Sequence, residues 1–221
     1  MRIRWFIILV PLLLLGARPD FKEGVSLYNR GAYWEALRIF AELADESGSL
    51  NPQRSASSYM RIRCYNKLGF SQRALMLARE FPGSYPKSDY LDDLKYLLGE
   101  IYLGLGDPRE SAWYFAESAV TTSDKKISKA ALDNAQTLVQ TVCDLDDLHA
   151  LAGRSIDRTG QFISLLVAER FLRDGERGEA IDILFNMRPY IQDDDLRKRA
   201  IHLYSQFSPA KADTLHIAVV L

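Results

Sequence analysis

Residues able to do chemistry are few in this chain, and their spacing forms no known catalytic motif. His149, His202 and His216 are scattered, and none has a nucleophile beside it in the sequence. The sequence has no Gly-x-Ser-x-Gly elbow, no His-Glu-x-x-His pair and no Gly-x-x-x-x-Gly-Lys phosphate loop. Gly104-Leu105-Gly106 begins like a dinucleotide fingerprint, but Arg109 stands where the third glycine is required. We therefore predict a protein that is not an enzyme and binds no cofactor.

Two acidic clusters are candidates for metal binding. Asp144-x-Asp146-Asp147 resembles the start of a calcium loop, but the central glycine and the closing glutamate are missing. Residues 193–195 are all aspartate, and residues 197–199 are all basic. We interpret both clusters as helix N-termini, which negative charge stabilises, and the basic residues as solvated partners. The sequence therefore predicts no metal site.

The elements that would position any site follow a repeated turn. Glycine separates helix-like stretches at Gly31, Gly69, Gly106 and Gly175, with similar flanking residues each time. The gaps are 38, 37 and 69 residues, so the last gap is close to two periods. A fixed period in this range is typical of stacked repeats. We therefore predict an all-α repeat fold.

Apolar residues at helical spacing locate the helices on either side of these turns. Ser88 or Asp89 is expected to cap the helix that precedes the third turn. Between the third and fourth turns, residues 124–143 predict one long helix and residues 146–154 a short partner helix. This degenerate pair explains the doubled gap. A last helix is expected from residue 193 to residue 207.

Composition limits the class of partner. The chain has 221 residues, a formal net charge of −1 and 48% hydrophobic residues, which is ordinary for a globular protein. A net charge near zero argues against nucleic-acid binding, which usually needs a basic face. Cys64 and Cys143 lie in non-adjacent repeats, and stacked repeats contact only their neighbours. We expect two buried thiols and no disulfide.

The helical units resemble tetratricopeptide repeats over roughly residues 19–207. In that family small and aromatic residues of the two helices interlock beside the turn glycine. The third unit matches best, and here Ser111 stands where alanine is usual. The resemblance implies a right-handed α-solenoid of helical hairpins over residues 18–208. The matching residues are Gly24, Tyr28, Gly31, Tyr33, Ala36 and Phe40; Tyr65, Gly69, Ala74 and Phe81; Gly99, Tyr102, Gly106, Asp107 and Phe115; and Ala168, Phe171, Gly175, Ala180 and Leu184.

In this family the first helix of each hairpin lines a concave groove, and we expect that groove to bind a protein or peptide partner. Arg63 and Lys67 lie one helical turn apart, a spacing suited to holding a peptide carboxylate. For any single residue, a solvated face is the alternative. By register with the matched repeats, the groove residues are Tyr28, Asn29, Tyr59, Arg63, Asn66, Lys67, Tyr96, Glu100, Glu169 and Arg173.

The N-terminus follows the plan of a secretory signal peptide. Arg2 and Arg4 form a basic start, residues 5–15 are an unbroken apolar run, and small residues follow at Gly16 and Ala17. We predict a signal peptide over residues 1–17 and a periplasmic location. An uncleaved N-terminal helix that anchors the protein is the alternative. In either case the membrane is involved only through this segment.

The C-terminal residues change character after Pro209. Residues 213–221 form a β-branched apolar run that predicts a strand, so we expect residues 209–221 to be a linker and the first strand of a truncated following domain. Residues 215–221 are similar to the opening strand of type I periplasmic-binding proteins. Residues 85–88 and 97–102 look like repeats of bacterial envelope proteins, namely outer-membrane assembly lipoproteins and the Tol–Pal-associated periplasmic protein.

A helical-repeat domain before a periplasmic-binding fold resembles the penicillin-binding-protein activators and some solute-binding proteins of branched-chain amino acid transporters. The activators are usually lipoproteins, and this chain lacks their cysteine. Two functions follow from these resemblances. The first is a non-catalytic scaffold of the bacterial cell envelope that binds a partner protein or peptide. The alternative is an accessory domain of a solute-binding protein of an ABC transporter, with its ligand site beyond residue 221.

Overall fold

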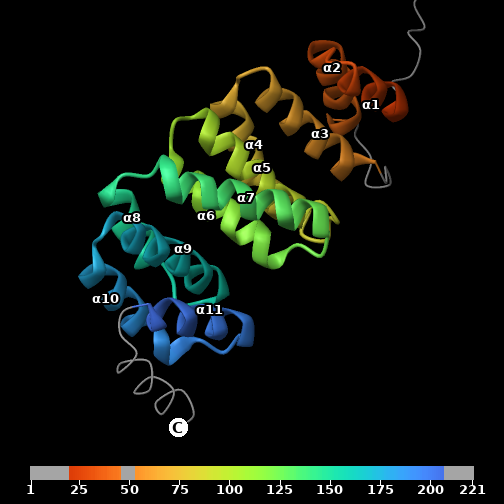
Figure 1. The fold of residues 1–221 in the computed structure, drawn as a ribbon. Coiled ribbons are helices and arrows are strands. Elements are labelled where there is room, and N and C mark those ends of the chain that lie inside the picture. The colour runs from red at the N-terminus through yellow and green to blue at the C-terminus, as the bar shows by residue number, and fades with distance from the viewer. Residues whose placement is uncertain (1–19, 46–52, 207–221) are drawn as a thin grey trace, which may run out of the picture. The chain divides into compact units, whose positions relative to one another are not determined.

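A computed structural model describes residues 20–45 and 53–206, which form α-helices and one short 3₁₀-helix without any strand (Figure 1). No helix among these residues has both the length and the apolar character needed to cross a membrane. The predicted signal peptide and the predicted C-terminal strand lie outside the described residues. The helices are α1 (Phe21–Asn29), α2 (Tyr33–Asp45), α3 (Arg54–Lys67), α4 (Ser71–Ser84), α5 (Leu91–Gly104), α6 (Pro108–Thr121), α7 (Lys125–Thr141), α8 (Leu145–Ala152), α9 (Arg158–Asp174), α10 (Arg177–Met187), η2 (Arg188–Tyr190) and α11 (Asp194–Ser205).

The chain divides after Cys64 into two compact units. In the first unit, α1 and α2 pack together, and α3 is tied to the end of α2. Arg54 Nε donates to the Ala44 carbonyl at 3.0 Å, and Arg61 Nη1 lies 3.0 Å from Asp45 Oδ1. The α3 side chains therefore satisfy groups at the carboxyl end of α2, where backbone carbonyls lack helical partners.

The predicted repeat of turn glycines is confirmed at all four positions. Gly31, Gly69, Gly106 and Gly175 have φ between 75° and 89°, and they are the glycines with positive φ among the described residues. At each turn the residue after the glycine donates to a carbonyl five residues back, for example Asp107 N–H to Tyr102 O at 3.0 Å. This is the Schellman arrangement, which ends a helix with a left-handed residue and favours glycine.

The interlock of small and large residues is also present in the structure. A Cβ atom at Gly99 would lie 2.7 Å from the Phe115 ring, and one at Gly24 would lie 2.8 Å from the Phe40 ring. Such distances are shorter than van der Waals contact, so each ring occupies the space that a side chain would need. The absence of a side chain thus lets the two helices of each hairpin approach closely. Ser111 adds a hydrogen bond from its Oγ to the Gly99 carbonyl at 2.8 Å.

The second unit holds a continuous apolar core built mainly by α6, α7, α9, α10 and α11, and its helices follow one another in chain order (Figure 1). Ile163, Leu165, Leu166 and Val167 are four of the α9 side chains that are fully buried. Such an uninterrupted run shows that α9 is covered on several faces. Its neighbours are α6, α7, α8, α10 and α11. Because α9 is the centre of this core, the surfaces beside it are held by a rigid support.

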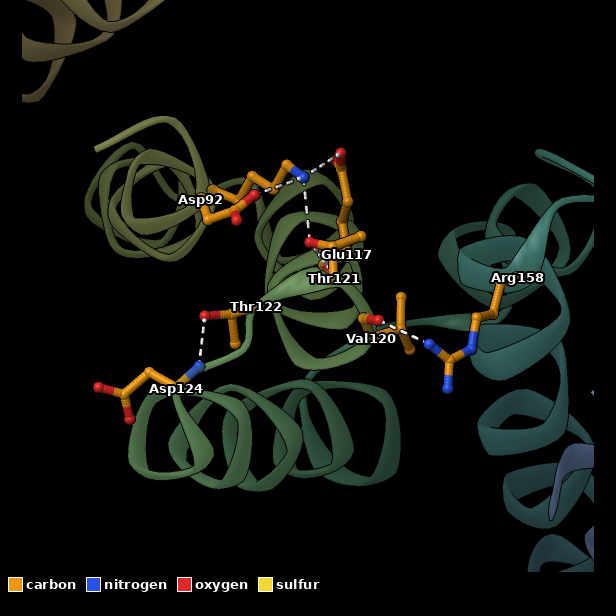
Figure 2. Close-up of polar contacts among 8 residues, drawn as sticks. Asp92, Glu117, Val120, Thr121, Thr122, Asp124 and Arg158 are labelled. Atoms are coloured by element: carbon orange, nitrogen blue, oxygen red, sulfur yellow. Dashed lines mark hydrogen bonds and ion pairs between the residues drawn. The ribbon is translucent and has the colours of Figure 1, made fainter. Parts of the chain in front are cut away.

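The carboxyl end of α6 is fixed by contacts from α5 and α9 (Figure 2). Lys95 Nζ lies 3.0 Å from Thr121 Oγ1 and 3.7 Å from Glu117 Oε1. From α9, Arg158 Nη1 donates to the Val120 carbonyl at 2.9 Å. Cationic side chains at this position complement the partial negative charge of a helix carboxyl end.

The predicted helices of the degenerate pair are confirmed as α7 and α8, but their packing differs from that of a hairpin. Both α7 and α8 pack mainly on α6 and α9 and not on each other. The N-termini of both helices are capped by aspartate: Asp124 Oδ1 accepts from Ile127 N–H and Asp144 Oδ1 accepts from Asp147 N–H. The connection between α7 and α8 thus relies on side-chain capping rather than on a left-handed glycine.

One predicted cap is wrong. Helix α5 begins at Leu91, and neither Ser88 nor Asp89 caps its backbone. The Ser88 Oγ instead accepts from Tyr90 N–H at 3.2 Å, and the Ser88 carbonyl accepts from Leu91 N–H. Ser88 is therefore used within the turn that precedes the helix, because its short side chain competes for nearby backbone groups.

The predicted state of the cysteines is confirmed. Cys64 and Cys143 are free thiols, and both are buried. Burial is the largest cause that raises the pKa of each thiol to about 12. A thiol in such surroundings is a weak nucleophile at neutral pH and acts as a small apolar group.

Candidate functional site

Three of the four predicted groove residues of the first unit form a packed cluster. Tyr28 and Tyr59 are each 8% exposed, so their rings belong to the core and not to an open surface. The guanidinium carbon of Arg63 lies 4.7 Å from the centre of the Tyr28 ring and 5.9 Å from that of Tyr59. Cation–π contacts of this kind fix the arginine against the two rings. Asn29, at the end of α1, is exposed.

The prediction that Arg63 and Lys67 hold a peptide carboxylate stays untested, and the structure gives each residue another partner. Arg63 belongs to the first unit, where the two tyrosine rings hold it. Lys67 belongs to the second unit, where its Nζ lies 3.3 Å from Glu100 Oε1 on α5. Asn66 precedes Lys67 and is half-buried. Lys67 and Glu100 thus neutralise each other across two first helices.

The predicted groove residues on α5 and α9 are also engaged by side chains of neighbouring helices. On α5, Tyr96 packs edge-on against Phe115, with ring centres 5.1 Å apart, and its hydroxyl accepts from Asn134 Nδ2 of α7 at 3.2 Å. On α9, Glu169 receives two hydrogen bonds of 2.7 Å from Arg199 of α11. Arg199 is therefore a structural partner of α9, which corrects its prediction as a solvated partner of the preceding aspartates.

Hydrogen bonds from long polar side chains also join α7 to α9. Gln140 Nε2 donates to the Leu166 carbonyl at 3.1 Å, and Arg170 Nη1 donates to the Val139 carbonyl at 3.1 Å. Arg173 donates to the Gln140 carbonyl. Long polar side chains of both helices are consequently held in single positions, at low further entropic cost to any ligand that contacts them.

An open groove of about 600 Å³ lies between α7 and α9. We call it the α7–α9 groove. Two of the ten predicted residues, Glu169 and Arg173, line it, and the other predicted residues do not. Among the residues that the structure describes, the side chains of Asp133 and Gln136 form no hydrogen bond or ion pair, and both are exposed. The groove is lined by Asp133, Gln136, Thr137, Gln140, Thr141, Glu169 and Arg173.

The α7 side of this groove was missed from the sequence because α7 has no turn glycine after it to set its register. A signal was nevertheless present. Asp133, Gln136, Thr137 and Gln140 follow the i, i+3, i+4, i+7 pattern, which places them on one helix face. A polar stripe of this kind, on a helix whose opposite face is apolar, identifies the face that stays open.

The acidic clusters behave as helix N-termini, as predicted. Asp144 caps α8, and Asp193 caps α11 by accepting from Asp195 and Leu196 N–H. The hydrogen bond from Leu196 holds the pKa of Asp193 below its usual range. Within residues 20–45 and 53–206, no group of three histidine, cysteine or acidic side chains is arranged to hold a metal ion.

Comparisons with known proteins give no family for this chain. No family model matches it, and no curated protein matches it. It is similar to two crystal structures of "kinesin light chain nearly identical TPR-like repeats" from Podosopora anserina, each at 18% identity over 77% of this chain and 92% of that chain. The TM-scores are 0.40 and 0.41. The assignment of helical hairpins rests on the four turns and their packing, and not on this likeness.

Proposed function

We propose that this chain is a non-catalytic scaffold of the bacterial cell envelope that binds a protein partner in the α7–α9 groove. The observation that carries the proposal is the contrast within this groove. Glu169, Gln140 and Arg173 are held by neighbouring helices, whereas Asp133 and Gln136 stay unpaired at the surface. The groove thus combines fixed walls with unused hydrogen-bonding groups.

The chemistry of the unpaired groups favours a peptide in extended form. The Gln136 amide carries both donors and an acceptor, so it matches the alternating N–H and C=O groups of a peptide backbone. The Asp133 carboxylate adds an acceptor that favours N–H donors or a positive charge. Extended peptides bind in this manner by main-chain hydrogen bonds. A groove without nucleophile, metal set or cofactor loop fits recognition rather than catalysis.

A peptide selection tests the proposal. A random-peptide display library is panned against the immobilised full-length chain, and the affinity of selected peptides is measured for variants. We expect Asp133→Lys and Gln136→Ala each to weaken selected peptides by about tenfold, because each substitution removes one or two hydrogen bonds. Both positions are exposed, so the fold is preserved.

Glu80→Lys is the matched control, because Glu80 is also an exposed acidic residue of a helix but lies on α4 outside the groove. Peptides that bind both groove variants as tightly as the unaltered chain would refute the groove assignment. Failure to select any peptide that binds the folded chain would do the same.

Export is part of the proposal, supported by the basic start and the apolar run of residues 5–15. A fusion of residues 1–30 to alkaline phosphatase, an enzyme that is active only after export, tests it in a bacterial host. Active phosphatase is the expected result. An inactive cytoplasmic fusion that regains activity behind a known signal peptide would contradict it.

A further inference from the structure

A second cavity of about 330 Å³ lies in the second unit, bounded by α8, α9, α10 and η2. We call it the α8–α10 pocket. It shares no lining residue with the α7–α9 groove, so any ligand of this pocket is separate from the partner proposed above. Buried side chains anchor both α9 and α10 in the apolar core, so the pocket is bounded by packed helices.

A buried glutamine marks the inner wall of the pocket. Gln161 is 7% exposed, and its Nε2 donates to the carbonyls of Ile156 and Tyr190 at 2.8 Å each. Two carbonyl acceptors require the amide nitrogen on that side, so the orientation of the amide is fixed. Both donors are thereby used.

The acceptor of the same amide is unused. Among the described residues, none donates a hydrogen bond to Gln161 Oε1, and this atom is not sealed from solvent. Gln161 lines the cavity and both of its amide hydrogens are bonded to carbonyls, so Oε1 is the polar atom of this side chain that is left for a ligand. The inner wall therefore suits a ligand that carries N–H groups.

The charges around the pocket favour a cation. Glu179 and Asp182 of α10 line it, and no lysine or arginine does. The single basic lining residue is His149, whose Nδ1 lies 3.9 Å from Glu179 Oε2. A guanidinium group offers five N–H donors in a planar fork, and it pairs well with carboxylates.

Apolar side chains also line the pocket, and they suit a ligand that carries an aliphatic part beside its charged group. Ala152, Ile183 and Met187 provide walls for an aliphatic stem. At the rim, Ile156 is 64% exposed and Tyr190 is 45% exposed. These two rim side chains offer apolar contacts to the residues that flank an arginine within a polypeptide, contacts that a free amine in the pocket would not make.

We propose that the α8–α10 pocket binds an arginine side chain of a partner polypeptide. The guanidinium donates to Gln161 Oε1 and pairs with Glu179 and Asp182. The aliphatic stem packs against Ile183 and Met187, and apolar neighbours of the arginine contact the rim.

The test uses the purified full-length chain and a fluorescein-labelled Gly-Leu-Arg-Leu-Gly peptide, with fluorescence anisotropy as the measurement. Saturable binding is expected. A peptide with citrulline in place of arginine keeps the shape but lacks the charge, and we expect it to bind about tenfold more weakly or worse. The double variant Glu179→Gln/Asp182→Asn should weaken the arginine peptide by a similar factor. In an NMR titration the Gln161 side-chain amide signals should shift.

Glu80→Lys is the matched control, since Glu80 is an exposed acidic residue of α4 outside both sites, and it should bind the arginine peptide as tightly as the unaltered chain. Loss of binding in the groove variant Asp133→Lys would place the peptide in the α7–α9 groove and overturn the pocket assignment. Absence of binding, equal binding of the citrulline peptide, or full binding by the double variant would each overturn the proposal. Free arginine amide that binds as tightly as the peptide would show a small-amine site instead and would also overturn it.

Discussion

Two neighbouring parts of the second unit, the α5–α6 hairpin and the α7–α8 segment, connect successive helices by different means. In the hairpin, Gly106 adopts φ of +75°, and Asp107 N–H returns to the Tyr102 carbonyl. After α7, Cys143 N–H makes the corresponding bond to the Leu138 carbonyl, but Val142 keeps φ of −113°. The hydrogen bond is retained while the left-handed residue is lost.

Packing differs in the same two regions. Gly99 and Phe115 interlock α5 with α6, whereas α8 buries Leu148 and Leu151 in the core and Arg154, which follows α8, contacts α6. Arg154 Nη2 lies 2.9 Å from Glu110 Oε2, and its guanidinium carbon lies 4.3 Å from the centre of the Trp113 ring. Between α8 and α6, polar and cation–π contacts thus accompany apolar burial, and no glycine interlock of the α5–α6 kind is used.

The difference bears on function, because both candidate sites adjoin the irregular segment. The α7–α9 groove uses α7, and the α8–α10 pocket uses α8. In the regular hairpin, by contrast, the predicted residues Tyr96 and Glu100 are engaged with neighbouring helices. Departure from the repeat leaves polar groups and space that a regular stack fills with its own side chains.

Among the variants that test this comparison, Gly99→Ala should cause the largest loss of stability. The added Cβ meets the Phe115 ring at 2.7 Å, so α5 and α6 are forced apart, and we expect the free energy of unfolding to fall by about 1–3 kcal/mol. Urea unfolding followed by circular dichroism measures it. Adding Phe115→Leu to the same chain should recover part of the loss relative to the sum of the two single variants. Strict additivity would show that the two residues do not interlock.

Gly106→Ala should have a smaller effect, a loss of about 1–2 kcal/mol, because an L-residue is strained at positive φ. Gly178→Ala is the matched control, since Gly178 lies within α10 with ordinary φ and nothing within 4 Å of an added Cβ. Alanine there should stabilise the protein by about 0.5–1 kcal/mol. Opposite signs in urea unfolding would confirm that the turn requires left-handed geometry. A neutral Gly106→Ala would contradict it.

The smallest expected effect concerns the α7–α8 connection and is the pH dependence of stability that comes from the Cys143 thiol. Burial first, then the charges of Asp147 and Asp144, raise the pKa of its thiol to about 12 from an ordinary 9.0. The folded state therefore holds the proton between pH 9.0 and about 12 while the unfolded chain releases it. Stability is accordingly complete below this window and falls as pH rises through it.

Urea unfolding at about pH 8 and about pH 10.5 measures this effect. Cys143→Ala should show a smaller decrease than the unaltered chain, because one thiol no longer contributes, whereas the tyrosines and Cys64 contribute equally to both. An identical decrease in the two proteins would show that Cys143 is not protonated preferentially in the folded state.

The sequence alone determined the helices, the four turns and much of the packing. Gly31, Gly69, Gly106 and Gly175 were identifiable because left-handed backbone geometry restricts the residue type at a single position. The buried interlocks were also identifiable from the sequence, because a glycine and an aromatic residue recur at a fixed spacing in the hairpins. Helix capping was predictable where aspartate preceded an apolar stripe, as at Asp144, and was not predictable at Ser88, where a turn used the same side chain.

Only the tertiary structure decided which polar residues are available to a partner. Tyr28, Lys67 and Glu169 occupy the register positions expected of a groove, yet an arginine, a glutamate and an arginine, respectively, contact them from other helices. Those partners lie 30 or more residues away in the sequence, so no local pattern reveals them. Asp133 and Gln161 became candidates for the opposite reason, because the folded chain leaves a carboxylate and an amide oxygen without a donor. Helix identity is set by neighbours along the chain, whereas availability is set by neighbours in space.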